Sequence, residues 1–418
     1  MLNENSMAAD RIGEQFMTFQ RRIFLGGLAA TAAFGSTSLL AKGKKPRVGI
    51  IGGGIIGASI AAQLAKAGAD VVLFEKKEPA AGATRNSVAW INPVVNDAHY
   101  MKLRLESMSA WLEDDRLFGM KAIWGGSTSW AYENKRGSLQ EKATLLEVTD
   151  DPPHYLTGEG ITKVNPGIFP GDNVKLAFQT FKDGHVDPVF ATQCYLAAAK
   201  RNGARIVYPC EVTAVTLRDG QLTGVKTTKG DYPLDHLVSA TGTDTPHVMG
   251  LLGRELKLAH KPGLVVHTAP QPVITKQVFE ASSIIEFKQY ADGRFLTSFT
   301  SGPPNLPQHA EILQHQMDYP DDFLRQHHGE MLIARTAEYM PAIAKGKVAK
   351  VLLGFRPYPL DNRPVIGAVP GVKGAYVVVT HSGITLAPIL GRYAAQEIMT
   401  GADAPILAPY RPSRYIAA

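Results

Sequence analysis

Cysteine is scarce in this chain, with only Cys194 and Cys210 among 418 residues. Two cysteines make neither a disulfide framework nor a zinc site, and no C-x-x-C pair is present for thiol redox work. Whether the two thiols pair depends on a distance that the sequence does not give. His327 and His328 have no third ligand nearby, so we interpret them as solvated surface and expect no metal site.

An excess of one charge is also missing, because the formal net charge is only +6. No run of lysine and arginine with interleaved aromatic residues occurs, so nucleic-acid binding is not expected. The composition, 45% hydrophobic and 20% charged, is that of a globular protein. The length is sufficient for two domains of ordinary size.

Long apolar runs are absent beyond the N-terminus. Residues 18–41 combine Arg21 and Arg22 with a Gly/Ala-rich apolar run, a pattern typical of a bacterial twin-arginine export signal. The run is diluted by Gly, Ser and Thr and makes a weak membrane span. We therefore expect a periplasmic protein. Transient or lasting attachment to the outer face of the inner membrane and a plain amphipathic extension stay open, as does cleavage of the segment.

The strongest motif lies between residues 47 and 75. A β-branched run predicts a buried strand, and Gly52, Gly54 and Gly57 then form G-x-G-x-x-G. These glycines permit a tight turn, a close approach of the backbone to a pyrophosphate, and close packing of helix on sheet. Glu75 ends the next strand, where an acid can accept a hydrogen bond from a ribose 2′-hydroxyl and repel a 2′-phosphate. The motif predicts dinucleotide binding and disfavours NADP.

Three later segments favour the same kind of ligand. Small residues and hydroxyls dominate residues 80–87, which suits a backbone close to a ligand, although an ordinary surface loop would look similar. A predicted strand ends at Ala240-Thr241-Gly242. A strand over 375–380, the turn 381–383 and a helix over 384–399 form a second strand–glycine–helix unit, which directs another helix N-terminus at the sheet.

The remaining pattern predicts mixed secondary structure. Residues 205–208 and 211–216 predict a hairpin that continues through Asp219-Gly220 into 223–228. The other elements expected are helices over 189–202 and 317–336 and strands over 263–268, 283–288, 293–298 and 351–357.

Taken together, these pieces resemble the FAD-dependent amine oxidoreductases typified by D-amino-acid oxidase, glycine oxidase and sarcosine oxidase. The resemblance covers about residues 46 to 400, in the order of that family. The segments that carry it are Gly52–Gly57 with Glu75, 82–90, 184–188, 240–242, 354–357 with 363–367, and 381–388.

The resemblance implies an α/β fold, in which a Rossmann-like FAD-binding domain of the glutathione-reductase type holds an inserted α+β substrate domain built on an antiparallel sheet. The expected division is an export segment 1–43, FAD-binding parts 44–93, 166–250 and 350–418, and substrate-domain parts 94–165 and 251–349.

The resemblance also implies the cofactor and its ligands. In family members that bind flavin covalently through the strand matching 352–357, a cysteine supplies the bond. Residues 352–357 hold no cysteine here, so FAD is expected to bind non-covalently. Glycines of the first motif would hold the pyrophosphate, Val212 the adenine, and residues 383–385 the flavin N1 and C2 oxygen. The residues expected to bind FAD are Gly52, Gly54, Ile55, Ile56, Gly57, Glu75, Lys76, Ala83, Thr84, Arg85, Val88, Ala89, Trp90, Val212, Ala240, Thr241, Gly242, Ser382, Gly383, Ile384 and Thr385.

Two residues are expected to act in catalysis. Arg356 matches a position that grips the substrate carboxylate, a task that suits the bidentate guanidinium, although a structural salt bridge is the alternative. His381 matches a position beside the flavin. The expected reaction oxidises the C–N bond of a D-amino acid, glycine or an N-alkyl amino acid by hydride transfer to flavin N5, and water then hydrolyses the imine.

Electrons are expected to come from the substrate, since a single dinucleotide motif leaves no site for a nicotinamide donor. Oxygen, or a quinone or other carrier, would take them up. Two alternatives stay open. One is an exported flavin dehydrogenase for 2-hydroxy acids or opine-like amines, and the other is a non-catalytic flavin-binding subunit.

Overall fold

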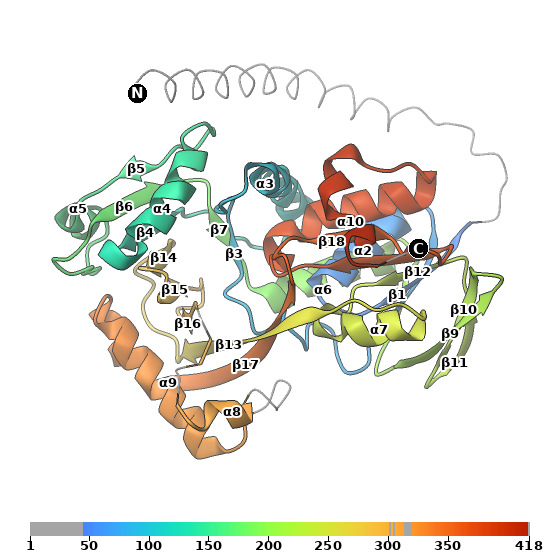
Figure 1. Cartoon of the computed structure of the whole chain (residues 1–418). Helices are drawn as coiled ribbons and strands as arrows, with labels where there is room; N and C mark the ends of the chain where they lie inside the picture. The colour runs from blue at the N-terminus through green and yellow to red at the C-terminus, as the bar shows by residue number, and fades with distance from the viewer. Residues whose placement is uncertain (1–44, 301, 304–305, 313–318, 417–418) are drawn as a thin grey trace.

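The computed structural model describes residues 45–300, 302–303, 306–312 and 319–416 (Figure 1). The predicted export segment, residues 1–43, lies outside the described residues. Among the helices within these ranges, none is long and apolar enough to cross a bilayer.

A six-stranded sheet in the order β18-β19-β12-β1-β2-β8 confirms the Rossmann-like core. Its strands are parallel except β18, which runs antiparallel to β19. Its strands are short and largely buried, as expected for a sheet covered on both faces. Their bounds are β1 Arg47–Ile51, β2 Asp70–Phe74, β8 Arg205–Val207, β12 His236–Ser239, β18 Val365–Ala368 and β19 Ala375–Val379.

Helices α2 (Ile55–Lys66) and α10 (Gly383–Thr400) pack side by side against this sheet (Figure 1). A Cβ on Gly391 would lie 2.2 Å from Ser59 Oγ, so the two helix backbones meet closely only because residue 391 is glycine. Helix α6 (Pro188–Arg201) packs on α2, and its bounds confirm the predicted helix over 189–202 within one residue.

Helix α3 (Ala98–Phe118) lies against α10, although the predicted division places it in the substrate domain. Trp111 Nε1 donates to the backbone carbonyl of Ile384 at 2.9 Å, and Ser107 Oγ donates to the carbonyl of Thr385 at 2.6 Å. The start of α10 is therefore fixed by a helix that precedes it by more than 250 residues.

The predicted hairpin between residues 205–208 and 211–216 is wrong, because its first strand pairs elsewhere. Strand β8 follows α6 and pairs parallel to β2, completing a β-α-β crossover in the large sheet. The second part is confirmed, since β9 and β10 pair through a turn at Asp219 and Gly220, both with positive φ. The separate three-stranded sheet consists of β9 Val212–Arg218, β10 Gln221–Thr227 and β11 Gly230–Pro233.

An eight-stranded sheet in the order β17-β13-β16-β15-β14-β4-β6-β5 forms the second half of the molecule. Its pairs are antiparallel except β14 with β4. The bounds are β4 Ser127–Ala131, β5 His154–Tyr155, β6 Leu176–Thr180, β13 Leu258–Thr268, β14 Val278–Ala281, β15 Ile285–Gln289, β16 Phe295–Phe299 and β17 Val348–Pro359.

Two of these strands belong to a different sheet from the one that the predicted division implies. β6 was expected in the second FAD-binding part and β17 largely in the third, yet both pair in the eight-stranded sheet. For β17 the reason is its length, because it pairs with β13 from Val348 to Pro359 and so carries the sheet up to the cofactor domain. The boundaries at 166 and 350 therefore do not coincide with the sheet that these strands join.

Helix α9 (Asp322–Ala337) covers the outer face of this sheet (Figure 1). The expectation of a solvated His328 is wrong. Residues 324, 328 and 332 share the buried face at helical spacing, which leaves His327 exposed and His328 fully buried. The His328 Nε2 lies 2.9 Å from the Nε2 of His309, and burial lowers the pKa of His328 to about 4.

The other elements are short or lie at the edges of the two large sheets. They are β3 Trp90–Ile91, β7 Gly184–His185, α4 Glu133–Leu146, α5 Gly158–Val164, α7 Thr245–Leu251 and α8 His309–Ile312.

Candidate functional site

The predicted cofactor residues lie at one edge of the six-stranded sheet. Gly52 follows β1, Glu75 follows β2, Ala240 follows β12, and Gly383 comes four residues after β19. These strands are parallel, so their carboxyl ends share an edge, which is where open α/β sheets bind ligands. A Cβ on Gly383 would lie 3.3 Å from Ile56 Cδ1, so the two glycine turns meet.

The glycine turn after β1 needs its glycines for packing. Gly52 has φ +107°, and a Cβ there would lie 2.5 Å from the carbonyl oxygen of Ala240. A Cβ on Gly57 would lie 2.0 Å from the carbonyl oxygen of Gly52. Both contacts are far below van der Waals distance, so the turn and the start of α2 require glycine at these positions.

The N-terminus of α2 is shaped for an anion. Its N-cap residue, Gly54, has no side chain to cap the helix, and its first turn holds no acidic residue. A Cβ added to Gly54 would have one neighbour within 4 Å among the described residues, Thr84 Oγ1 at 3.2 Å, so the space beside Gly54 is open. That hydroxyl accepts a hydrogen bond from the Ile55 N–H at 3.1 Å and can still donate its own proton. The remaining N–H groups and the helix dipole suit a pyrophosphate.

Glu75 is held at the same edge. Its Oε2 accepts from the Gly53 N–H and its Oε1 from the Lys77 N–H, both at 2.8 Å. Each carboxylate oxygen keeps a lone pair, so Glu75 can accept a further hydrogen bond from a hydroxyl.

Three predicted cofactor residues are less directly placed. The Lys76 side chain pairs with Asp244, and Arg85 pairs with Glu78 at 2.7 Å. Both cations therefore already have carboxylate partners in this structure. Val212 begins β9 beyond Glu75 and is buried, so it could contact a ligand only through its backbone, as the resemblance implies.

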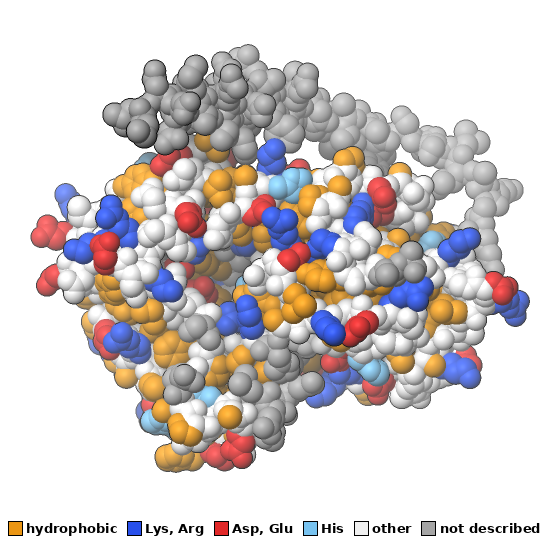
Figure 2. All heavy atoms as spheres, viewed as in Figure 1, with side chains coloured by type: hydrophobic (Ala, Val, Ile, Leu, Met, Phe, Trp, Pro, Cys, Tyr) orange, Lys and Arg blue, Asp and Glu red, His pale blue; other side chains and the backbone are white. Residues whose placement is uncertain are grey.

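A cavity of about 310 Å³ lies between the two large sheets. In the space-filling view, the surface is hollowed between the two halves of the molecule, and acidic and basic side chains are interspersed around the hollow (Figure 2). The predicted residues that line the cavity are Ala83, Val88, Ala89, Trp90, Arg356, His381, Ser382, Ile384 and Thr385. Among them Ala89 has φ +56°, a strained conformation that often marks a functional loop.

Arg356, on β17, is held by two backbone carbonyls. Its Nη1 donates to the carbonyl of Thr300 at 2.9 Å and its Nη2 to that of Pro262 at 3.1 Å. Its buried Nε has no partner. No carboxylate lies within ion-pair distance of Arg356 among the residues that the structure describes. The guanidinium is therefore fixed in direction and keeps N–H groups for a ligand.

His381 stacks on Tyr358, with ring centroids 4.0 Å apart and 16° between the planes. The His381 side chain lines the cavity and is exposed in this structure. Burial, and after it the positive charges of Arg356, Arg104 and Lys261, lower the pKa of His381 to about 3. The imidazole is therefore neutral at pH 7 and shapes the cavity without adding charge.

Arg104 is a site residue that sequence reasoning missed. It lies on α3 and lines the cavity, with its Nη1 donating to Ser382 Oγ at 3.1 Å and its Nε to the carbonyl of Asn92 at 2.9 Å. A guanidinium keeps its charge even though burial lowers its pKa. A positive charge thus stands next to the N-terminus of α10. One signal was available, because Arg104 interrupts the apolar stripe between Met101 and Met108.

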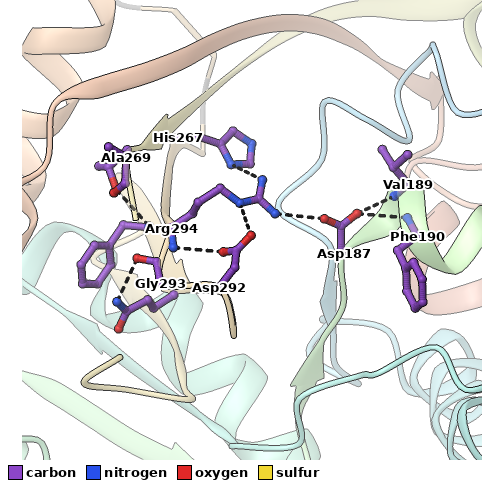
Figure 3. Close-up of polar contacts among 11 residues, drawn as sticks. Asp187, Val189, Phe190, His267, Ala269, Asp292, Gly293 and Arg294 are labelled. Carbon is purple, nitrogen blue, oxygen red and sulfur yellow. Dashed lines mark hydrogen bonds and ion pairs between the residues drawn. The ribbon is translucent and has the colours of Figure 1, made fainter. Parts of the chain in front are cut away.

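Asp187, in the motif 184–188, joins the two halves of the molecule and is not in the cavity wall. Its Oδ1 accepts from the N–H groups of Val189 and Phe190 and caps α6 (Figure 3). Its Oδ2 lies 3.1 Å from Arg294 Nη2, at the start of β16 (Figure 3). This motif is therefore structural.

Replacing Asp187 by alanine is expected to destabilise the fold by about 1 to 2 kcal/mol, the usual effect of losing an N-cap. Asp187→Asn keeps a capping oxygen and loses only a partly exposed ion pair, so it is expected to cost under about 1 kcal/mol. Thermal unfolding of the two variants beside the parent protein compares the two effects. Equal losses would show that the ion pair, and not the cap, carries the stability.

The family comparison is decisive. A family model described as "DAO: FAD dependent oxidoreductase" matches residues 47–397. This chain belongs to that family. As a member of the DAO family it is an enzyme that uses FAD, and the expectation of a flavoprotein fold is confirmed.

Individual relatives are distant. The chain is 24% identical over 397 residues to the Bacillus subtilis protein named "Uncharacterized oxidoreductase YurR", covering 88% of this chain and 99% of that one. It is 25% identical over 413 residues to dimethylglycine dehydrogenase of Homo sapiens, covering 88% of this chain but only 44% of the relative. The crystal structure of glycine oxidase from Geobacillus kaustophilus has a TM-score of 0.76 at 23% identity, covering 89% of this chain and 100% of that one, and shows the shared fold.

The residues fit FAD. The start of α2, the open space at Gly54 and the fixed carboxylate of Glu75 suit a dinucleotide. Arg104 and the start of α10 would face the end of the cofactor that becomes negative on reduction. The described residues hold no cluster of His, Cys, Asp or Glu that could bind a metal ion. Cys194 and Cys210 are both free.

Replacing Glu75 by alanine is expected to weaken FAD binding by roughly 10- to 100-fold, the effect of losing one or two hydrogen bonds to a charged acceptor. Apoprotein titrated with FAD and followed by flavin fluorescence measures the change. Glu255→Ala is the matched control, because Glu255 is an exposed residue that pairs with Lys257 and neither residue is expected to bind FAD. If both variants bind FAD like the parent, Glu75 does not hold the cofactor.

Proposed function

We propose that this DAO-family enzyme oxidises the C–N bond of an amino-acid-like substrate whose carboxylate binds Arg356. The observation that carries the proposal is the state of Arg356 in the cavity wall. Two backbone carbonyls fix its guanidinium, while no carboxylate of the described residues lies within ion-pair distance of it. A half-buried guanidinium held in this way is best satisfied by a substrate carboxylate.

The other cavity residues suit oxidation of a neutral amine. FAD, when bound, supplies the electron acceptor for the substrate C–H bond. Arg356 would orient the substrate by its carboxylate. His381 is neutral at pH 7, so it adds no charge beside a substrate amine that binds in its deprotonated form. Arg104 and the N-terminus of α10 supply fixed positive potential beside Ser382 and Thr385.

The relatives support the same substrate class. Glycine oxidase and dimethylglycine dehydrogenase are named for compounds that carry a carboxylate one carbon from an amine. We propose either oxygen or a membrane quinone as the final acceptor. Export to the periplasm by the twin-arginine route, inferred from residues 18–41, would favour the quinone.

Anaerobic mixing of the holoenzyme with amine substrates tests the proposal. The panel holds D- and L-amino acids, glycine, sarcosine and dimethylglycine, with 2-hydroxy acids of the same side chains as controls. Bleaching of the visible flavin absorbance by amines alone is the expected result. Bleaching by the hydroxy acids alone would replace the proposal by a 2-hydroxy-acid dehydrogenase, and bleaching by neither would overturn it.

A further inference from the structure

Two glutamates line the cavity on the wall formed by β14 and β15. Glu280 and Glu286 are directly opposite each other in the antiparallel pair, so their side chains share one face of the sheet. Like charges in this position are destabilising. Ser298, the cross-strand partner of Glu286 on β16, lines the same cavity.

The two carboxylates differ in their partners. Glu280 receives hydrogen bonds from Ser129 Oγ at 3.4 Å and Ser283 Oγ at 3.2 Å, and Lys142 Nζ lies 3.6 Å away. Glu286 pairs with both neighbouring strands through its backbone, but its carboxylate has no hydrogen bond and no ion pair with any other residue of the described ranges. Burial, and after it the charge of Glu280, raise the pKa of Glu286 to about 7. The charges of Arg356 and Lys142 act in the opposite direction, but the described residues place no cation within ion-pair distance of Glu286. A buried carboxylate of this kind is stabilised by a cation that binds next to it.

The position of these acids relative to Arg356 sets the length of a ligand. Glu286 lies in one cross-strand row with Ser298, Val265 and Leu352, whereas Arg356 lies four residues further along β17. Three strand spacings across the sheet and four residues along it place the backbones of Arg356 and Glu286 about 19 Å apart. Both side chains reach into the cavity, so their charged ends lie closer together than that. An extended lysine spans roughly 7 to 8 Å from carboxylate carbon to terminal nitrogen.

We propose that the substrate carries a second cationic group, an ammonium or guanidinium, which Glu286 and Glu280 bind while Arg356 holds the carboxylate. This inference rests on the proposed function, since it names the substrate class of the same site. Basic amino acids fit it. Amino acids with neutral side chains leave Glu286 without a partner, and dicarboxylates would bring a third negative charge to the acid pair.

Matched substrate pairs test the proposal in the holoenzyme. Arginine is compared with citrulline and lysine with norleucine, each as both enantiomers, by the rate of anaerobic flavin reduction and by kcat/KM. The cationic member is expected to be better by roughly 10- to 100-fold. Glu286→Gln is expected to bring that ratio close to one. Glu338→Gln, on an exposed residue paired with Arg335, is the control and should leave the ratio unchanged.

A binding measurement without turnover tests this inference separately from the proposed function. 6-Aminohexanoate and hexanoate differ by one ammonium group, and calorimetric titration of the holoenzyme needs no turnover. Tighter binding of the amino compound, lost in Glu286→Gln, supports the cation site even if no amine reduces the flavin. Equal binding of the two overturns it, and so does amine oxidation that shows no preference for a cationic side chain, although the proposed function would then stand.

The thermal stability of Glu286→Gln excludes a merely structural role. The folded state raises the pKa of Glu286 above that of an ordinary glutamate, so ionisation opposes folding at pH 8. The variant is therefore expected to unfold about 2 °C or more above the parent at that pH. A lower unfolding temperature would show that the carboxylate stabilises the fold and would overturn its assignment to substrate binding.

Discussion

Replacing Arg356 by leucine should lower kcat/KM for the amino-acid substrate by roughly 100- to 1000-fold. The loss corresponds to about 3 to 4 kcal/mol, the range for a desolvated, charge-assisted pair with a carboxylate. Most of the effect should be on KM, because the carboxylate is held equally before and during the reaction. Arg356→Lys keeps the positive charge but loses the paired N–H groups that bind a carboxylate through both oxygens. It should therefore recover only part of the lost kcat/KM.

The structure suggests how to check the Arg356 result. Leucine also leaves the carbonyls of Thr300 and Pro262 without their donors, so FAD content and unfolding temperature must be measured beside the kinetics. Arg335→Leu removes a surface guanidinium that pairs with Glu338 and should have no kinetic effect. A parental KM in Arg356→Leu would mean that the substrate carboxylate binds elsewhere.

Replacing Gly57 by alanine should weaken FAD binding by at least about 100-fold. The added methyl carbon would stand 2.0 Å from the carbonyl oxygen of Gly52, so either α2 or the glycine turn must move. A shift of that size costs roughly 3 kcal/mol, and the turn that moves is the one expected to hold the pyrophosphate. The variant should purify largely without flavin absorbance and regain little when FAD is added.

The chain offers a matched control for Gly57. Gly137 lies in α4, and a Cβ there would meet nothing within 4 Å. Gly137→Ala should keep the flavin and gain up to about 1 kcal/mol in stability, the usual difference between glycine and alanine in a helix. If Gly57→Ala holds FAD as tightly as Gly137→Ala, the glycine turn does not contact the cofactor.

The parts of the site that local chemistry dictates could be predicted from the sequence. The turn at Gly52–Gly57 and the acid at Glu75 follow from spacing within one β-α-β unit, where each residue is near its partners in the chain. Arg356 and His381 needed the family resemblance as well, because nothing in their neighbourhood distinguishes a cavity residue from a surface one.

Residues whose role depends on distant contacts could not be found in this way. Arg104 reaches Ser382 across 278 positions, and the pairing of Glu280 with Glu286 depends on the strand register. Strand β8 was assigned to a hairpin because its neighbour in sequence, β9, was the nearest strand, whereas the packing of α6 carries it to β2. The local sequence pattern predicts the helices and strands, but the tertiary structure determines which strands pair with one another.

The distance along the chain between the two glycine turns has a consequence for biosynthesis. Gly52 and Gly383 stand at opposite ends of the described chain, and the segment between them builds the cavity. A nascent polypeptide still lacking α10 has a dinucleotide turn but no second half to the flavin pocket. Closure of the pocket around a cofactor therefore has to wait until α10 has been synthesised, and a chain that stops before residue 383 lacks one of the two glycine turns.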